Sequence, residues 1–489
     1  MSEATLTLST APATPPKAFR LTDIGNAERL IDQFGRDLRY VPAWKTWLVW
    51  DQRRWAYDTT KQVERYAKAA VRSMLGDARN PHCPDDIKAA LRAHAYKSES
   101  NKSINAMLAR ATAEPDVAIS HTELDRDPWL LTVANGELDL RTAQLTDHRR
   151  ETLATKIVDV TWDPEARCDR WEAFLSRVLG GSQELIDFVQ RAVGYSLTGL
   201  TTEECLFFLY GTGRNGKTTF LEIVRAVTGE YATQADFTTF LEGRTDGGPR
   251  NDIARLFGAR VVTSSEVGEN KKLNEPLMKS LTGGDTIAAR RLYSEAFEFE
   301  PAFKLWLAAN HKPKITGTDE GMWSRIRLVP FTVQIPEAER DAGLRDVLEA
   351  ELPGILAWAV AGCRLWQRRG LGAPLEVRDA TAAYRVEQDL LGAFLDEYCE
   401  VGESYSASTP PLYDAYKEWA HDSEIKPLSK IAFGRQLGDR GFRGDKVGTG
   451  NARTTWRFGL RLVRWANTGA TWASERERRD AAAQEDLEI

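Results

Sequence analysis

An apolar pentapeptide that runs directly into a glycine-rich loop constrains this chain more than any other feature. Residues Leu206–Tyr210 have the apolar run of a buried strand, and a helical pattern begins just beyond the loop. Glycines in such a loop let backbone N–H groups turn toward phosphate oxygens. The sequence therefore predicts a strand, a phosphate-binding loop and a helix, in the spacing G-x-x-x-x-G-K-[ST]. The loop is Gly211-Thr212-Gly213-Arg214-Asn215-Gly216-Lys217-Thr218.

The last two residues of this loop predict binding of a nucleoside triphosphate with Mg²⁺. Lys217 places a point charge where the β- and γ-phosphates would lie, and Thr218 offers a hydroxyl to the metal. The N-terminus of the following helix favours an anion as well. A plain glycine turn between a strand and a helix is the alternative interpretation. We expect ATP and Mg²⁺ as cofactors.

Two later strands end in polar side chains that suit the same site. The run from Arg260 to Ser265 is followed by Glu266, which lies 49 residues after Lys217. A carboxylate there would contact Mg²⁺ and orient the attacking water. The strand before Asn310 could likewise bring an amide to the γ-phosphate or the water. The alternatives are an ordinary strand end for the glutamate and a turn-forming residue for the asparagine.

Arg325 lies just before another apolar strand, where its charge can reach the nucleotide of a neighbouring subunit. An arginine stays ionised and donates to developing phosphoryl charge. Arg327 is a rival for this role, and a structural ion pair is the alternative.

A predicted hairpin lies between the strand that ends at Ser265 and the strand that precedes Asn310. The segment from Lys279 to Phe299 reads as a turn, a strand, a tip and a returning strand. Arg290, Arg291 and Tyr293 near its tip could hold a nucleic-acid backbone. A surface face of ion pairs is the alternative.

Composition describes an ordinary protein without a membrane span. The 489 residues are 42% hydrophobic and 28% charged, and a chain of this length should form two to four domains. No apolar stretch approaches the roughly 18 residues that a spanning helix needs. The five cysteines are scattered without a C-x-x-C pair, so we expect neither a zinc site nor disulfides, and a reducing cytoplasm. The first 24 residues read as a disordered tail rather than a signal peptide.

A basic segment near the C-terminus predicts nucleic-acid binding despite a net charge of −6. Residues His421 to Asn467 hold ten basic side chains against four acidic ones. Two helices followed by a basic hairpin are typical of a winged helix, in which the second helix would present Lys430 and Arg435 to a DNA groove. We expect Ser429 to cap that helix and Gly441 to end it. A solvated basic face is the alternative.

The N-terminal region is rich in tryptophan. Trp44, Trp47, Trp50 and Trp55 flank a polar turn and predict a hairpin whose rings pack in a core, with base stacking as the less favoured use. Further on, one continuous helix is expected over 376–398.

The motifs in this order resemble the phage/plasmid primase–helicase family, superfamily 3 helicases of the satellite-phage and poxvirus replication type. The resemblance covers about residues 30 to 460 and is densest from Asp127 to Phe331. It rests on five segments, which are Gly-Thr-Gly-Arg-Asn-Gly-Lys-Thr, Val-Val-Thr-Ser-Ser-Glu, Leu-Thr-Gly-Gly-Asp-Thr-Ile, Lys-Leu-Trp-Leu-Ala-Ala-Asn-His-Lys-Pro and Trp-Ser-Arg-Ile-Arg-Leu-Val-Pro-Phe.

The resemblance implies an AAA+-like core that assembles as a homo-oligomeric ring, a hexamer, on DNA with ATP between subunits. It implies that Lys217, Thr218, Glu266 and Asn310 form one half of the ATP site. Arg325 and Lys279 would act across the interface, and residues 290–294 would form a DNA-gripping hairpin.

Two departures from the family pattern stand out. Many relatives end the second motif with two acids, whereas this chain has Ser265-Glu266. The 150 or so residues before the helicase region offer neither zinc-ligand spacing nor a clustered acid set for nucleotidyl transfer. We therefore expect no primer synthesis by this chain, and a separate primase or polymerase as a partner.

The expected fold class is α/β, with a parallel-sheet P-loop core, an α+β domain before it, and a helical segment and winged helix after it. The predicted domains are a tail at 1–24, an N-terminal domain at 25–165, an ATPase core at 166–335, a helical lid or linker at 336–395, a winged helix at 396–468 and a charged tail at 469–489.

The predicted function is an ATP-dependent replicative DNA helicase of a phage, prophage or plasmid, acting on single-stranded and forked DNA in the cytoplasm of a bacterial or phage-infected cell. The alternative is an ATP-controlled origin-binding initiator or loader. A DNA-packaging ATPase is disfavoured, because no nuclease-type carboxylate cluster accompanies the motifs.

Overall fold

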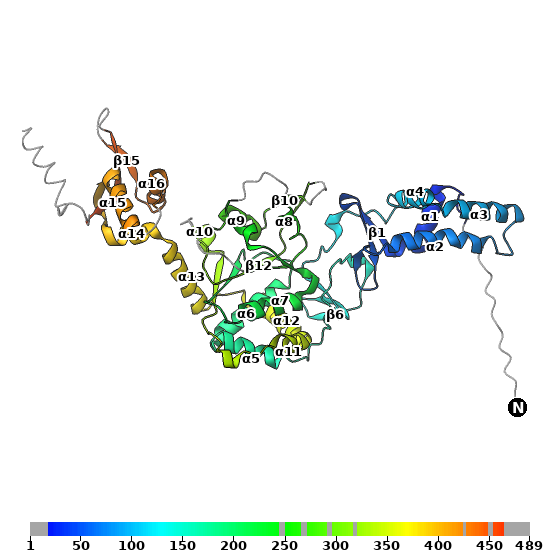
Figure 1. Ribbon diagram of the computed structural model, residues 1–489, viewed down its shortest axis with the longest axis horizontal. Coiled ribbons are helices and arrows are strands. Elements are labelled where there is room, and N and C mark those ends of the chain that lie inside the picture. The colour runs from blue at the N-terminus through cyan, green and yellow to red at the C-terminus, as the bar shows by residue number, and fades with distance from the viewer. Residues whose placement is uncertain are drawn as a thin grey trace, which may run out of the picture.

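The computed structural model of the chain describes residues 18–243, 250–265, 271–290, 296–315, 320–423, 427–447 and 453–463. The molecule is elongated, with a helical N-terminal region at one end, a central α/β body and a small C-terminal module at the other end (Figure 1). No helix within these ranges has the length and apolar content needed to cross a bilayer.

The N-terminal region joins four helices to a small antiparallel sheet. The polar turn that follows Trp50 forms as predicted, and Trp55 is fully buried, so the tryptophans pack mainly in a core. The elements are α1 (Asp23–Phe34), β1 (Leu38–Val41), the 3-10 helix η2 (Pro42–Trp44), β2 (Thr46–Trp50), β3 (Trp55–Tyr57), α2 (Gln62–Asp77), α3 (Asp85–Ser98) and α4 (Asn101–Ala111).

A second antiparallel sheet leads from this region into the central body. It consists of β4 (Leu130–Val133), β5 (Gly136–Asp139) and β6 (Gln144–Thr146). Leu131 and Leu138 belong to the same buried cluster as the helices beside the phosphate loop. The hydrophobic core of the central body is therefore continuous across residue 165, where a domain boundary was placed from sequence.

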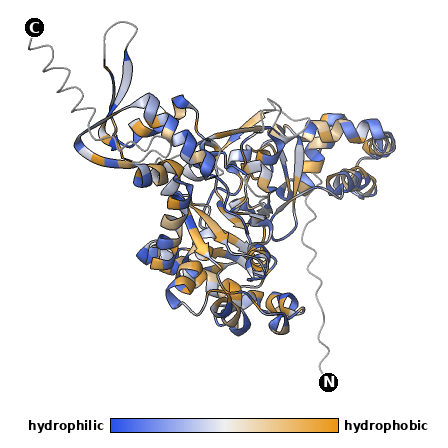
Figure 2. Ribbon diagram, turned by 60° about the vertical axis from the view of Figure 1, so that its left-hand side comes forward, coloured by the Kyte–Doolittle hydropathy of each residue, from blue (hydrophilic) through white to orange (hydrophobic). Residues whose placement is uncertain are grey.

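A five-stranded, all-parallel sheet forms the central body. Its order is β13–β7–β12–β9–β8. The inner strands β7, β12 and β9 are almost entirely buried, whereas the edge strand β8 is polar and partly exposed. Figure 2 shows strands of the central body in the orange of apolar residues. The strands are β7 (Leu206–Tyr210), β8 (Ala232–Gln234), β9 (Val261–Ser265), β12 (Lys304–Ala309) and β13 (Ile326–Pro330).

Helices cover both faces of this sheet. On one face α5, α6, α7 and α12 share a buried cluster with Phe207 and Trp306, and on the other α9 and α13 pack over Phe208. Gly180 and Gly181, both with positive φ, separate α5 from α6. The helices of the body are α5 (Asp169–Val178), α6 (Gln183–Ser196), α7 (Lys217–Thr228), α8 (Asn251–Ala254), α9 (Glu275–Gly283), α10 (Glu320–Trp323), α11 (Leu344–Ala350), α12 (Leu352–Arg369) and α13 (Leu375–Gln388).

The hairpin expected between β9 and β12 is present. It pairs β10 (Ile287–Arg290) with β11 (Ala296–Phe299) in antiparallel register. Its tip, residues 291–295, lies outside the described residues.

The continuous helix expected over 376–398 is wrong, because the chain breaks at Asp389. Its backbone leaves the helical region (φ −88°, ψ 68°), and its side chain accepts a hydrogen bond from Gly392 N to begin α14 (Leu390–Tyr398). Tyr384 of α13 packs in the central body, whereas Phe394 of α14 packs in the C-terminal module. Asp389 therefore marks the junction between these two cores.

The C-terminal module is a winged helix. Ser429 caps α16 (Lys430–Asp439) by accepting from Ala432 N, and Gly441 follows that helix with φ 88°, both as predicted. The predicted strands are β15 (Gly444–Val447) and β16 (Thr454–Leu462). The module also contains α15 (Thr409–Asp422) and a strand that sequence analysis missed, β14 (Cys399–Ser408), which pairs with β16. The fold class expected from the sequence is confirmed.

Candidate functional site

The glycine-rich loop connects β7 to α7, and its conformation depends on its glycines. Gly213 and Gly216 have φ of 102° and 83°, a region that other residues rarely adopt. A Cβ on Gly211 would lie 2.0 Å from Asn215 Nδ2 and 2.2 Å from the carbonyl oxygen of Phe331. The loop is thus folded tightly over the ends of β7 and β13.

The Asn215 side chain holds the loop to the sheet. It is buried, and its Nδ2 donates to Phe331 O at 2.7 Å. Its other amide atom, Oδ1, accepts from Lys217 Nζ at 2.8 Å. Sequence analysis placed Asn215 in the loop but did not predict this bridge, because its partner lies 116 residues further along the chain.

Lys217 is the first residue of α7, and its ammonium group is enclosed by three oxygens. It donates to Gly211 O at 2.7 Å, to Asn215 Oδ1 at 2.8 Å and to Asn310 Oδ1 at 3.0 Å. No carboxylate pairs with it among the described residues. Burial lowers its pKa from the ordinary lysine value to about 8. A buried ammonium held only by neutral oxygens is ready to pair with an incoming anion.

The polar residues predicted from separate strands meet at one edge of the sheet. Tyr210 of β7 lies beside Ala309 of β12, and Ala308 lies beside Ser265 of β9. Asn310 follows β12 directly, and its hydrogen bond to Lys217 confirms that the two residues lie together. Glu266 is the next residue after β9, but it lies outside the described residues. Thr218, in the first turn of α7, is exposed at the same edge.

A pocket of about 340 Å³ opens beside the loop. Its apolar walls come from Phe174 of α5, Ile335 after β13 and Leu344 of α11, and Gly216 and Thr219 form the side toward the loop. Arg214, Glu339, Arg340 and Asp341 also line it. A pocket with apolar walls and a few polar groups is typical of a small-molecule site. Sequence analysis missed this pocket, because its walls come from three distant segments.

Arg325 lies at the opposite edge of the sheet from Lys217. Its carbonyl accepts from Leu206 N at 2.8 Å, at the beginning of β7, whereas the phosphate loop follows the end of that strand. A five-residue strand spans about 17 Å, so Arg325 does not reach the loop of its own subunit. Its guanidinium donates to Gly321 O and pairs with Glu204 at 2.7 Å. The rival Arg327 donates to the backbone oxygens of Ser324 and Ile326.

Lys279 lies near Arg325 on the same side of the body. It is in α9, one turn before Gly283, and a Cβ on Gly283 would lie 3.5 Å from Arg325 Nη2. The structure thus brings the two basic residues expected to act together to one surface.

Of the three hairpin residues predicted to contact DNA, one lies within the described residues. Arg290 is exposed at the end of β10, opposite Ala296. Arg291 and Tyr293 fall in the tip and lie outside the described residues.

Comparison with known proteins gives three family matches along the chain. Residues 27–180 match the family described as D5 N terminal like, and residues 387–443 match the one described as Poxvirus D5 protein-like. Residues 209–325, which hold the phosphate loop, match a family of unknown function, DUF5906.

Similar proteins come from large DNA viruses. A putative helicase of Acanthamoeba polyphaga mimivirus is 26% identical over 321 residues, which are 60% of this chain and 33% of that protein. A putative helicase of Frog virus 3 is 29% identical over 270 residues, covering 50% and 28%. The Primase D5 of Fowlpox virus is 23% identical over 239 residues, covering 46% and 30%. These matches support the primase–helicase family that the sequence motifs resemble.

The fold is also similar to that of a solved structure. The C-terminal region of NrS-1 has a TM-score of 0.52 and 10% identity, and the match covers 88% of this chain and 99% of that one. The matched part of this chain spans only about a third of the length of each of the three viral proteins named above.

The D5-like match at residues 387–443 falls on α14, α15 and α16, the helices of the winged helix. Lys430 and Arg435, which sequence analysis predicted to contact DNA, are both exposed on α16. Ile431 between them is 86% exposed, whereas Phe433 and Leu437 on the other side of the helix are buried. In this chain α16 therefore presents a basic surface with an apolar centre.

Proposed function

We propose that this chain is an ATP-dependent DNA helicase that acts as a ring of identical subunits, a hexamer, during DNA replication. The observation that carries the proposal is the split of the basic residues between two edges of one sheet. Lys217 lies in a neutral cradle at one edge and Arg325 at the other, so one complete catalytic site needs two subunits. A site shared in this way is what a ring-forming translocase requires.

The triphosphate of ATP would lie on the loop from Gly211 to Thr218. Its γ-phosphate would replace one or more of the oxygens that now surround Lys217, and Asn310 would be released to contact the phosphate or the attacking water. The base would enter the pocket lined by Phe174, Ile335 and Leu344.

Mg²⁺ fits the oxygen ligands that the sequence supplies at this edge. Thr218 offers an exposed hydroxyl in the first turn of α7, and Glu266 follows β9, which is separated from β7 by β12. When bound, the ion would neutralise charge on the phosphates. Glu266 would orient the water, and Arg325 and Lys279 of the adjacent subunit would stabilise the charge that develops on the γ-phosphate.

Two surfaces would contact DNA in this proposal. The hairpin would hold single-stranded DNA through Arg290, Arg291 and Tyr293, and the winged helix would contact duplex DNA through Lys430 and Arg435. Primer synthesis is assigned to a separate primase or polymerase, so this chain alone should make no primer on a single-stranded template.

Substitution of the loop lysine tests the assignment. Lys217→Ala should lower ATPase and unwinding of a forked duplex by at least about 100-fold, because the charge on the phosphates is lost. Lys417→Ala is a matched control, since that lysine is exposed on α15 and pairs with Asp414. Unwinding by the Lys217→Ala variant at the wild-type rate would rule out the proposal.

Mixing of two inactive variants tests the shared site. Arg325→Ala should bind ATP normally but lose hydrolysis, because its own loop is intact. When it is mixed with Lys217→Ala, some interfaces combine an intact loop with an intact arginine, so ATPase should return. No recovery at any mixing ratio would exclude a site shared between subunits.

An ATP-controlled initiator or loader is the second candidate, and the exposed basic face of α16 favours it. Such a protein would bind duplex sites tightly without separating strands. A strand-displacement assay on a fork, compared with binding to the duplex alone, distinguishes the two functions.

A further inference from the structure

The tryptophan-rich region has no role in the function proposed above, yet one of its rings reaches the central body. Trp44 ends η2, which connects β1 to β2. Its ring lies 5.8 Å from that of His121 and 5.6 Å from that of Phe257, at an angle of 74° to the latter. Phe257 follows α8 and packs against the buried cluster of the central body. Trp44 is thus an aromatic bridge between two separately packed regions.

Phe257 continues this contact to the hairpin. Its ring lies edge-on to Phe297 and to Phe299 of β11, at 5.6 Å from each. Edge-to-face pairs at this separation have a preferred direction, so they fix orientation as well as distance. Four rings therefore connect the N-terminal region to the returning strand of the hairpin.

The register of the hairpin gives this contact a consequence for Arg290. Phe297 lies opposite Ala289 and Phe299 opposite Ile287, so these side chains share one face of the hairpin. Arg290 is one residue further along β10 and therefore lies on the other face, where it is exposed. Phe257 therefore contacts the face of the hairpin opposite to the one that carries Arg290.

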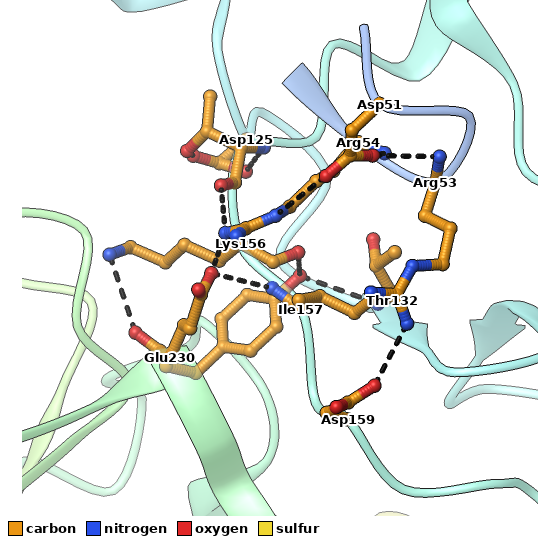
Figure 3. Close-up of polar contacts among 11 residues, drawn as sticks. Asp51, Arg53, Arg54, Asp125, Thr132, Lys156, Ile157, Asp159 and Glu230 are labelled. Atoms are coloured by element: carbon orange, nitrogen blue, oxygen red, sulfur yellow. Dashed lines mark hydrogen bonds and ion pairs between the residues drawn. The ribbon is translucent and has the colours of Figure 1, made fainter. Parts of the chain in front are cut away.

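The sheet that carries Trp44 is itself anchored to the central body, as Figure 3 shows for the turn between β2 and β3. Arg54 pairs with Glu230, whose Oε2 also accepts from Ile157 N at 3.3 Å. Arg53 pairs at 2.8 Å with Asp159, two residues after Ile157. Glu230 lies in the 3-10 helix (Gly229–Tyr231) that follows α7, the helix that begins at Lys217. The anchored sheet gives Trp44 a fixed support.

We propose that Trp44 is a positioning residue that holds the base of the hairpin, through Phe257, so that its arginine face is directed toward single-stranded DNA. The DNA-binding part rests on the proposed function, whereas the mechanical part concerns the protein alone. Two experiments separate them.

The first experiment measures amide hydrogen exchange in β10 and β11 of the full chain without DNA or nucleotide. Trp44→Ala should speed exchange there by about threefold to tenfold, as expected when an aromatic pair is removed, and Trp44→Phe should restore most of the protection. Tyr66→Ala is the matched control, because Tyr66 is a half-buried ring of the same region that stacks on Phe34. Unchanged exchange in the hairpin of Trp44→Ala would overturn the proposal even if the protein is a helicase.

The second experiment measures ATPase with and without oligo(dT). Trp44→Ala should raise the oligo(dT) concentration needed for half-maximal stimulation by about threefold to tenfold while the basal rate stays unchanged. Phe257→Leu should do the same from the other side of the contact. An equal fall in basal and stimulated rates, or an effect as large in Tyr66→Ala, would indicate a purely structural role and overturn the proposal. Faster hairpin exchange without any stimulation of the wild type by DNA would instead refute the helicase function.

Discussion

At the level of single residues, Lys217 combines a charge with burial. Burial removes water from its ammonium group and thereby lowers its pKa to about 8, while three neutral oxygens accept its hydrogen bonds. In the folded protein Lys217 is therefore partly deprotonated at mildly alkaline pH. A bound polyanion would favour its protonated form.

This shift predicts proton uptake on ATP binding. Between about pH 8 and the ordinary lysine pKa of about 10.4, the free protein holds Lys217 mostly neutral, and the phosphates should raise its pKa and recharge it. Calorimetry in buffers of different ionisation enthalpy at pH 9 should give uptake close to one proton, and Lys217→Ala should give none. Equal uptake by both proteins would contradict the assignment.

Between about pH 8 and 10.4 the unfolded chain binds more protons than the folded one, so the contribution of Lys217 to the free energy of unfolding rises with pH.

Gly211 predicts a second effect at this scale. A methyl group there collides with Asn215 Nδ2 and Phe331 O, both fixed to each other by a hydrogen bond. Gly211→Ala should lower the free energy of unfolding by about 1–3 kcal/mol and weaken nucleotide binding. Gly76→Ala in α2 is the control, since nothing lies within 4 Å of its added Cβ. Urea denaturation of both variants measures the difference, and a neutral Gly211→Ala would contradict the tight packing of the loop.

At the level of elements, local pattern predicted the strand before the phosphate loop, the hairpin, and the two helices of the winged helix with the Ser429 cap of the second. It did not predict the break at Asp389, because the residues on both sides of it keep helical spacing. Strand β14 was missed because its residues are mostly polar and exposed, so it lacks the alternation of a half-buried strand. The order of the central strands and the pocket beside the loop depend on contacts between distant segments, which spacing alone does not reveal.

The exposed face of α16 predicts a salt-dependent interaction with duplex DNA. The double variant of Lys430→Ala with Arg435→Ala should weaken binding and lower the slope of log affinity against log salt by about 2, because each substitution removes one charge that neutralises a phosphate. Arg461→Ala should change the slope little, because that arginine pairs with Glu400 and lies 4.2 Å from the ring of Tyr405. Fluorescence anisotropy at several salt concentrations gives the slopes. An equal change in both variants would argue against α16 as the DNA-binding surface.

At the level of the whole molecule, the winged helix and the central body have separate cores that meet at Asp389. Its carboxylate caps α14 and pairs with Arg440 of the module. Asp389→Ala should therefore destabilise the C-terminal module by about 0.5–2 kcal/mol while nucleotide binding by the central body is retained. Asp389→Asn should keep the cap and lose the ion pair. Thermal unfolding followed by tryptophan fluorescence, with ATP binding measured in parallel, checks both outcomes, and a loss of ATP binding would show that the two cores are not independent.

The separation of Lys217 and Arg325 by the length of a strand also affects how a damaged copy would act within an assembly. In the proposed ring each chain would carry half of two different sites, so a subunit that lacks only one of these residues would inactivate one interface. A subunit that lacks both residues would inactivate the ATP sites at both of its interfaces. At equal molar ratios to wild type, the double variant Lys217→Ala with Arg325→Ala should thus lower the ATPase activity of a mixed ring more than either single variant. None of the three variants should be active alone.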